Sequence, residues 1–311
     1  MLNVEPQPRR TSAERLAAFG PAQLRDGALR RRMARAGLEQ RIHPLAEGGQ
    51  LAYWTGGVGR PLLLMGGFGA DALWQWFAIA PTLARSHRLF IPDLLHFGQS
   101  HGASRAPSLE GQVDAIRELL DAQLPVGRRV DAVGLSYGGL VVWALASQQP
   151  ERVDRLVLMG TPGDVFGAED LAGLHQRFAI DHPADLLLPS DVDGMRRLIA
   201  VGFHRPPPVP NFILRDVHRF HYLGQRAEKR ALIDDLLARL GGEVPAIDCA
   251  RHQSLLIWGR HDAIFPLEIG DRLRQRLGSH ATLHVVEDTA HAPPQERPRP
   301  VLAAMGRFLQ D

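Results

Sequence analysis

Short apolar segments alternate with longer amphipathic segments along most of the chain. The short, β-rich segments fall near residues 41–45, 51–54, 61–65, 88–92, 129–133, 154–159, 253–258 and 281–286. Apolar positions at helical spacing mark segments near 73–84, 108–123, 138–149, 267–277 and 297–310. Strands that alternate with helices predict a mostly parallel sheet with helices on both faces. We therefore expect an eight-stranded, doubly wound α/β sheet whose first two strands, before Gly56 and Gly57, form an antiparallel pair.

The alternation stops after Gly160-Thr161-Pro162-Gly163 and resumes only near residue 253. Residues 164–248 are too many for a plain loop, and they carry helical patterns at 171–180, 195–203 and 211–240. Residues 206–210 form a proline-rich connection that is stiff because each proline fixes φ. Aromatic and polar side chains in this part of the chain fit two interpretations, a largely apolar pocket or packing onto the core. We expect a helical insertion at 164–248, between core segments 41–163 and 249–311.

The N-terminal segment, residues 1–40, is predicted to be helical. Thr11 and Glu14 have the spacing of a capping box for a first helix. A second helix would place Leu24, Leu29 and Met33 against a row of arginines. Packing of this helix on the catalytic body is the favoured interpretation, and weak contact with an anionic membrane surface is the alternative.

Composition is that of an ordinary globular protein. The 311 residues are 45% hydrophobic and 23% charged, with a formal net charge of +2. These values indicate neither nucleic-acid binding nor disorder. No apolar run reaches the length of a membrane span, and the first residues do not resemble a signal peptide, so we expect a cytoplasmic protein. The single cysteine, Cys249, excludes an internal disulfide, and the sequence shows no metal-ligand spacing.

The pentapeptide Gly134–Gly138 fits the pattern Gly-x-Ser-x-Gly, with Ser136 at its centre. It lies between a predicted strand and a predicted helix, which is the setting of a nucleophile elbow. In such an elbow the serine hydroxyl is exposed, and the following helix N-terminus favours a developing oxyanion. The pattern also arises by chance in glycine-rich turns, but this context favours a catalytic nucleophile.

A serine nucleophile needs a base and an acid, and the sequence offers both downstream. Asp262 follows a predicted strand that ends at Gly259, and His291 follows the last predicted strand. The chain order serine, acid, histidine matches that of one hydrolase fold. His291 would take the proton from Ser136, and Asp262 would orient the imidazole. Asp288 is an alternative acid, but it lies only three residues before His291 on the same loop.

Four blocks of the sequence together resemble the α/β-hydrolase superfamily, in its monoacylglycerol lipase and epoxide-hydrolase-like branch. They are residues 62–76, residues 91–100, the elbow, and the Asp262 and His291 pair. The resemblance implies the α/β-hydrolase fold, a helical cap at 164–248, and an oxyanion hole made by the backbone N–H groups of Phe68 and Tyr137. It implies no cofactor, because a serine triad needs no metal or organic group.

The sequence departs from the family pattern in two of these blocks. Gly66 stands where the family usually has a histidine that braces the oxyanion loop, so we expect a loop that is looser or shaped differently. His96 stands where the second block usually has a glycine. The serine at position 136, where epoxide hydrolases use an aspartate, favours acyl transfer.

The leading functional expectation is a carboxylic-ester hydrolase acting on a fairly apolar small molecule, such as a monoacylglycerol. Two alternatives stay open. One is a hydrolase with the same triad that cleaves a carbon–carbon or amide bond. The other is a ligand-binding module with vestigial turnover.

Overall fold

A single twisted sheet forms the centre of the molecule in the computed structural model, which describes residues 20–239, 247 and 251–310. Within these residues the sheet has nine strands, in the order β1-β2-β4-β3-β6-β7-β8-β9 with β5 paired to β2. The strands are β1 (Leu38–Pro44), β2 (Gly49–Gly56), β3 (Arg60–Met65), β4 (His87–Pro92), β5 (His101–Gly102), β6 (Val130–Leu135), β7 (Val153–Met159), β8 (Ser254–Gly259) and β9 (Ala281–Val286).

The pairing of the strands follows the prediction, with one strand more than expected. β1 pairs antiparallel with β2, and β2 pairs antiparallel with β4, whereas β4, β3, β6, β7, β8 and β9 run parallel. The predicted count of eight strands was wrong because β5 has only two residues, too few to leave an alternating pattern. The expected mostly parallel α/β sheet with helices on both faces is confirmed.

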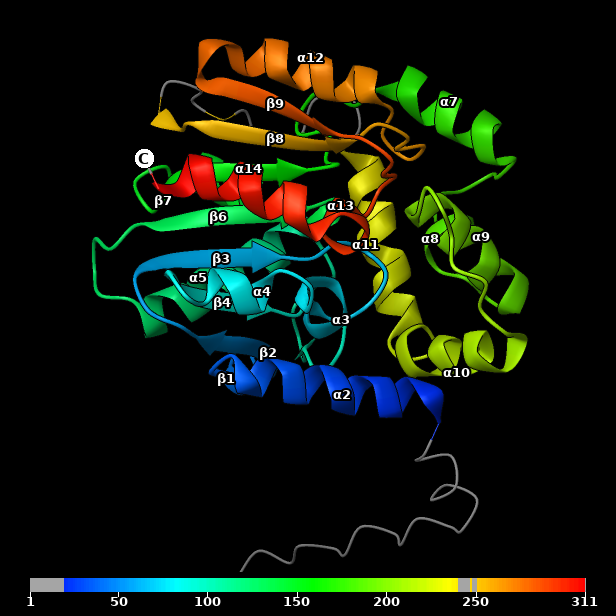
Figure 1. The fold of residues 1–311 in the computed structure, drawn as a ribbon, viewed down its shortest axis with the longest axis horizontal. Helices are drawn as coiled ribbons and strands as arrows, with labels where there is room; N and C mark the ends of the chain where they lie inside the picture. The colour runs from blue at the N-terminus through cyan, green and yellow to red at the C-terminus, as the bar shows by residue number, and fades with distance from the viewer. Residues whose placement is uncertain (1–19, 240–246, 248–250, 311) are drawn as a thin grey trace, which may run out of the picture.

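Helices cover both faces of the sheet (Figure 1). One face carries α5 (Leu109–Gln123), α6 (Tyr137–Gln148) and α12 (Leu267–Leu277). The other carries α2 (Pro21–Arg35), α3 (Ala72–Trp76), α4 (Ala80–Leu83) and α14 (Pro298–Gln310). Side chains of the central strands alternate between these two cores, so that Leu63 faces one and Leu62 the other. The central strands are apolar on both faces because both faces are buried.

One predicted helix is divided in the structure, and another is intact but has a short helix before it. The segment at 73–84 is divided into α3 and α4, and Pro81 lies at the start of α4, where its missing N–H costs nothing. The segment at 297–310 is preceded by a separate short helix, α13 (Pro293–Glu296). The 3-10 turn Gly278–His280 lies between α12 and β9.

Among the described residues between β7 and β8, where the sequence predicted an insertion, there are five helices. They are α7 (Ala168–Phe178), α8 (Ala184–Leu187), α9 (Val192–Gly202), α10 (Asn211–His221) and α11 (Arg226–Ala238). In Figure 1 helices α8–α11 stand beside one end of the sheet, next to α13 and α3. The predicted domain boundary near 248 falls among residues that the structure does not describe.

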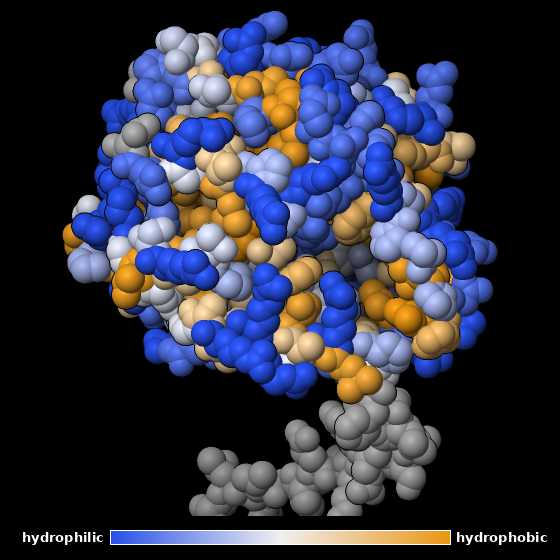
Figure 2. Space-filling model, in the orientation of Figure 1, coloured by the Kyte–Doolittle hydropathy of each residue, from blue (hydrophilic) through white to orange (hydrophobic). Residues whose placement is uncertain are grey.

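The N-terminal helix α2 uses its apolar side for packing. Leu29 and Met33 are buried in the core. Asp26, also on α2, accepts a hydrogen bond of 3.1 Å from Nε1 of Trp74 on α3. Leu24 is exposed, one of several separate apolar positions on a largely hydrophilic surface (Figure 2). Membrane contact through this helix therefore stays a prediction, with Leu24 as its main apolar support.

The predicted capping box of Thr11 and Glu14 lies outside the described residues, as does Cys249. Within the described residues, no helix combines the length and the apolar character needed to cross a membrane.

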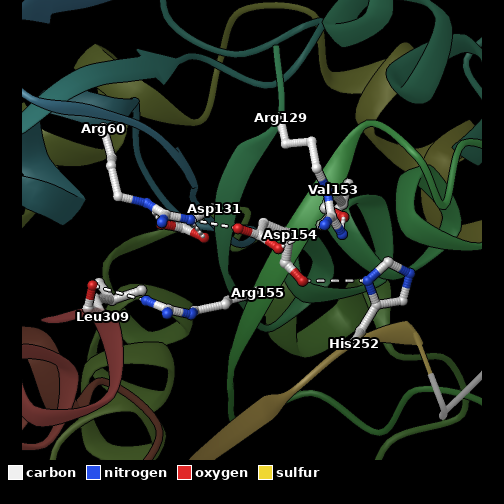
Figure 3. Close-up of polar contacts among 8 residues, drawn as sticks. All are labelled: Arg60, Arg129, Asp131, Val153, Asp154, Arg155, His252 and Leu309. Atoms are coloured by element: carbon white, nitrogen blue, oxygen red, sulfur yellow. Dashed lines mark hydrogen bonds and ion pairs between the residues drawn. The ribbon is translucent and has the colours of Figure 1, made fainter. Parts of the chain in front are cut away.

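A cluster of charged side chains lies across the start of β3, β6 and β7, away from the elbow (Figure 3). Asp131 is buried, and its carboxylate accepts a hydrogen bond of 3.3 Å from Arg60 Nε. Arg60 also pairs with Asp154, which Arg129 contacts at 2.9 Å. Burial raises the pKa of Asp131, and the Arg60 guanidinium opposes that shift. Arg60 is therefore the cation that makes a charged Asp131 tolerable inside the sheet.

Replacing Arg60 with methionine should lower the free energy of unfolding by about 2 kcal/mol, between the values typical of exposed and of buried ion pairs. Urea denaturation would measure it. Arg260→Met is the control, because Arg260 and its partner Glu287 are both largely exposed, and its effect should be close to zero. Equal effects of the two substitutions would contradict this role of Arg60.

Candidate active site

Ser136 lies in a sharp turn between β6 and α6, as the Gly-x-Ser-x-Gly pattern predicts. Its φ of 53° is in the left-handed region, which is strained for a serine, and its N–H donates to Met159 O at 2.9 Å. Both glycines of the pattern are required. A Cβ on Gly134 would lie 2.4 Å from Gly138 O, and a Cβ on Gly138 would lie 2.3 Å from Gly66 O.

The structure brings Asp262 and His291 together from loops after β8 and β9. His291 Nδ1 lies 2.8 Å from Asp262 Oδ2, and Asp262 is 5% exposed. The other carboxylate oxygen, Oδ1, accepts hydrogen bonds of 2.9 Å from the N–H groups of Ile264 and Phe265. These bonds fix the carboxylate, which in turn orients the imidazole ring. The alternative acid, Asp288, pairs instead with Arg297 at 2.8 Å on the surface.

Ser136 lies where two cavities meet beneath the insertion. The first, of about 80 Å³, is lined almost entirely by apolar side chains, including Phe166, Leu174 and Ile233. The second, of about 160 Å³, is lined by Ser136, His291 and residues of α9 and α13. Within the described residues, the Ser136 hydroxyl makes no hydrogen bond to the His291 ring. Such contacts in hydrolases often tighten only when substrate is bound.

The two predicted oxyanion donors flank the elbow. Gly67 lies against the nucleophile, since a Cβ on it would be 2.8 Å from Ser136 Cβ. The rings of Phe68 and Tyr137 meet edge to face with centroids 4.9 Å apart. Among the described residues, neither the Phe68 N–H nor the Tyr137 N–H donates a hydrogen bond to the protein. Both N–H groups are therefore free to donate, as the predicted oxyanion hole requires.

The oxyanion loop is held by a residue that sequence reasoning missed. Gln75 of α3 is buried and makes three hydrogen bonds to the backbone of Gly67 and Ala70. Gln75 fills the space beside Gly66, and its hydrogen bonds oppose the loosening that the missing histidine predicted. The absence of the usual histidine was the one sequence signal that a substitute had to exist.

The loop that carries His291 is also tied to the insertion. Glu296 Oε1 accepts a hydrogen bond of 2.7 Å from the Ala290 N–H, and its Oε2 accepts one of 2.6 Å from the His204 N–H. The Ala292 N–H donates to Gly202 O at 3.1 Å. Sequence reasoning also missed Glu296, which no motif marks.

A third cavity, of about 160 Å³, borders the far side of the oxyanion loop and is polar. Its lining includes Asp71, Asp93, His96 and Lys229. Burial raises the pKa values of both carboxyl groups, most strongly that of Asp93. His96, with φ of 73°, contacts Gln225 of the insertion at 3.2 Å through Nδ1. This cavity lies between the core and the insertion, and Ser136 is not among its lining residues.

Lys229, the only lysine of the chain, should titrate well below an ordinary lysine. It is 3% exposed, and burial lowers its pKa to about 8. Between pH 8 and 10.5 the unfolded chain would then bind more protons at this site, so the free energy of unfolding should rise with pH there. Selective ¹³C labelling of lysine gives one Cε resonance to titrate, assigned by its loss in Lys229→Arg. A midpoint near 10.5 would contradict the expectation.

The described residues contain no group of three or more His, Cys, Asp and Glu side chains placed to hold a metal ion.

Comparison with known proteins gives the same superfamily. The family model described as alpha/beta hydrolase fold matches residues 60–206. The chain is 30% identical to a 2-hydroxymuconate semialdehyde hydrolase of Pseudomonas sp. (strain CF600), over 82% of this chain and 88% of that protein.

Solved structures point the same way. A 2-hydroxy-6-oxo-6-phenylhexa-2,4-dienoate hydrolase from Rhodococcus sp. strain RHA1 is 26% identical, with a TM-score of 0.68 over 88% of this chain and 97% of the other. A putative lipase from Acinetobacter baumannii AYE shares the fold, with a TM-score of 0.78 at 22% identity over 92% and 95% of the two chains.

These relatives correct one expectation from the sequence. The monoacylglycerol lipase and epoxide-hydrolase-like branch was wrong, because the chain is similar over most of its length to the semialdehyde hydrolase and the dienoate hydrolase named above. The reason is physical. The elbow, the acid and the histidine serve any hydrolysis through an acyl-enzyme, so motifs around them do not distinguish the branches.

Proposed function

The chain belongs to the alpha/beta hydrolase family, and on that premise we propose that it is a serine hydrolase that cleaves a carbon–carbon bond beside a carbonyl group. One observation carries the serine mechanism: Ser136 lies in a strained elbow and lines the same cavity as His291, whose ring is held at 2.8 Å by Asp262. The similarity over most of the chain supports the choice of bond.

The proposed roles follow from the geometry. Ser136 Oγ attacks the carbonyl carbon while His291 Nε2 accepts its proton, and Asp262 stabilises the imidazolium that forms. The N–H groups of Phe68 and Tyr137 bind the carbonyl oxygen as it becomes negative. His291 then protonates the departing carbon, and a water molecule hydrolyses the acyl-enzyme. The insertion at 164–248 would act as the cap that excludes bulk water.

The names of the relatives' substrates indicate which bond is broken. A 2-hydroxy-6-oxo-6-phenylhexa-2,4-dienoate contains neither an ester nor an amide, so its hydrolysis must break a carbon–carbon bond. Before the bond breaks, the 2-hydroxydiene must take up a proton at C5 and lose the hydroxyl proton, becoming the 2-oxo-3-ene tautomer. The carbanion that then leaves at C5 is conjugated with the 2-oxo group, which stabilises it. The first cavity, which is apolar, would hold the group on the carbonyl, and the second would hold the remainder.

Ester hydrolysis is the second candidate, and the cavity linings favour it. A dienoate substrate carries a carboxylate, yet neither cavity that meets at Ser136 has an arginine or lysine among its described lining residues. The polar side chains of the second cavity are few, among them Gln75, Tyr222 and Gln295. Such a lining suits an uncharged, apolar ester at least as well as a carboxylate.

Two substrate series would decide between these candidates. One series is 2-hydroxy-6-oxo-dienoates with methyl or phenyl at C6, and the other is p-nitrophenyl esters from acetate to laurate. A kcat/KM at least tenfold higher for a dienoate supports carbon–carbon cleavage, and the reverse supports ester hydrolysis. Tight binding of either series without turnover would overturn both and favour a binding module.

A further inference from the structure

Gln75 is the feature of the oxyanion loop that family membership does not explain. We propose that Gln75 is the positioning residue that aims the Phe68 N–H at the reacting carbonyl, in the place of the histidine that Gly66 replaces. The inference rests on the proposed function, since it takes the Phe68 N–H as an oxyanion donor. Gln75 itself touches no reacting atom in this proposal.

The hydrogen bonds of Gln75 fix the orientation of one peptide group. Gln75 Oε1 accepts from the Gly67 N–H at 2.7 Å, and Nε2 donates to Gly67 O at 3.0 Å and to Ala70 O at 2.6 Å. The Gly67 carbonyl and the Phe68 N–H belong to the same peptide group. In a trans peptide they point in opposite directions, so holding the carbonyl toward Gln75 turns the Phe68 N–H away from it. Gly67 lies against Ser136, so the direction of the Phe68 N–H is fixed beside the nucleophile.

Gly66 and Gln75 share one space. A Cβ on Gly66 would lie 2.7 to 2.8 Å from the amide atoms of Gln75, closer than any real carbon contact. A histidine at position 66 and the present position of Gln75 are therefore incompatible. In this proposal the buried Gln75 amide takes the place of the histidine side chain. It leaves no room for a side chain at position 66, so a glycine is needed there.

The test measures how fast Ser136 reacts with an alkyl fluorophosphonate. The serine oxygen forms a bond to phosphorus, fluoride leaves, and the serine proton passes to His291. Intact-protein mass spectrometry follows the reaction, which needs the oxyanion hole but no particular natural substrate. In Gln75→Met, which keeps the volume but loses all three hydrogen bonds, the rate constant should fall by about 10²-fold. The KM for any accepted substrate should change little beside kcat.

Gln112 supplies a matched control. It is also buried, and it braces the Leu95 backbone in the same way, accepting at 2.8 Å and donating at 3.3 Å. Gln112→Met should cost comparable stability and leave the phosphonylation rate unchanged. An equal loss of rate in both variants would reduce Gln75 to a general structural role and overturn the proposal.

A double substitution tests the shared space. Gly66→His alone should slow phosphonylation because the ring displaces Gln75, whereas Gly66→His with Gln75→Ala should react faster than Gly66→His. If the double variant loses as much phosphonylation rate as Gly66→His and Gln75→Ala together, the two positions do not compensate each other and the proposal is overturned. A wild type that reacts but hydrolyses no substrate would overturn the proposed function alone. A wild type that does not react would overturn both.

Discussion

Replacing Ser136 with alanine is expected to lower kcat by about 10⁶-fold on any substrate that the protein turns over. The proposed mechanism forms its covalent intermediate at this hydroxyl, which alanine lacks. Steady-state kinetics with either substrate series would measure the loss. The remaining rate would report what the oxyanion hole and binding contribute alone.

The fold should survive that substitution. The Ser136 hydroxyl makes no hydrogen bond to the protein within the described residues, and alanine meets the same backbone strain at φ 53°. Ser108→Ala is the control, since Ser108 Oγ caps α5 by accepting from the Gly111 N–H at 3.1 Å. That variant should lose about 1 kcal/mol of stability and keep its kcat. If folded Ser136→Ala still turned over substrate at the wild-type rate, Ser136 would not be the nucleophile.

Asp262→Asn is expected to lower kcat by about 10⁴-fold, because an amide no longer selects the imidazole tautomer that can accept the serine proton. The backbone N–H groups of Ile264 and Phe265 would still hold the side chain in place. The effect should therefore appear in kcat and in the phosphonylation rate, with little change in the melting temperature.

The neighbouring aspartate gives the decisive comparison. Asp288 lies three residues before His291, but its carboxylate pairs with Arg297 on the surface, and both side chains are largely exposed. Asp288→Asn should leave kcat within a factor of two or so, because an exposed ion pair contributes little. A large loss of kcat in Asp288→Asn with little loss in Asp262→Asn would show that Asp288 is the acid of the triad.

Local patterns explain why so much of the core was predictable. The parallel strands are buried on both faces and therefore appear as continuous apolar runs. β6 was predicted at 129–133 and found at Val130–Leu135. Chain order then placed Asp262 and His291 at strand ends, because consecutive strand–helix units deliver their loops to one edge of the sheet.

Other features depended on contacts that are distant in sequence. β5 forms only because His101 and Gly102 meet β2. Glu296 acquires a role only where the Ala290 and His204 N–H groups converge. The substrate branch was missed for a similar reason, since the cavities beside Ser136 are lined by residues from separate parts of the chain.

The sequence by itself determined the sheet, the elbow at Ser136 and the pair that would serve it, because each depends on local spacing and strand order. Only the tertiary structure decided how the oxyanion loop is held and what lines the cavities beside Ser136. Gln75 and Gly66 lie nine positions apart and look unrelated in sequence. They act together because α3 folds back onto the loop after β3, where a buried amide must find backbone partners and leaves no room for a side chain at position 66.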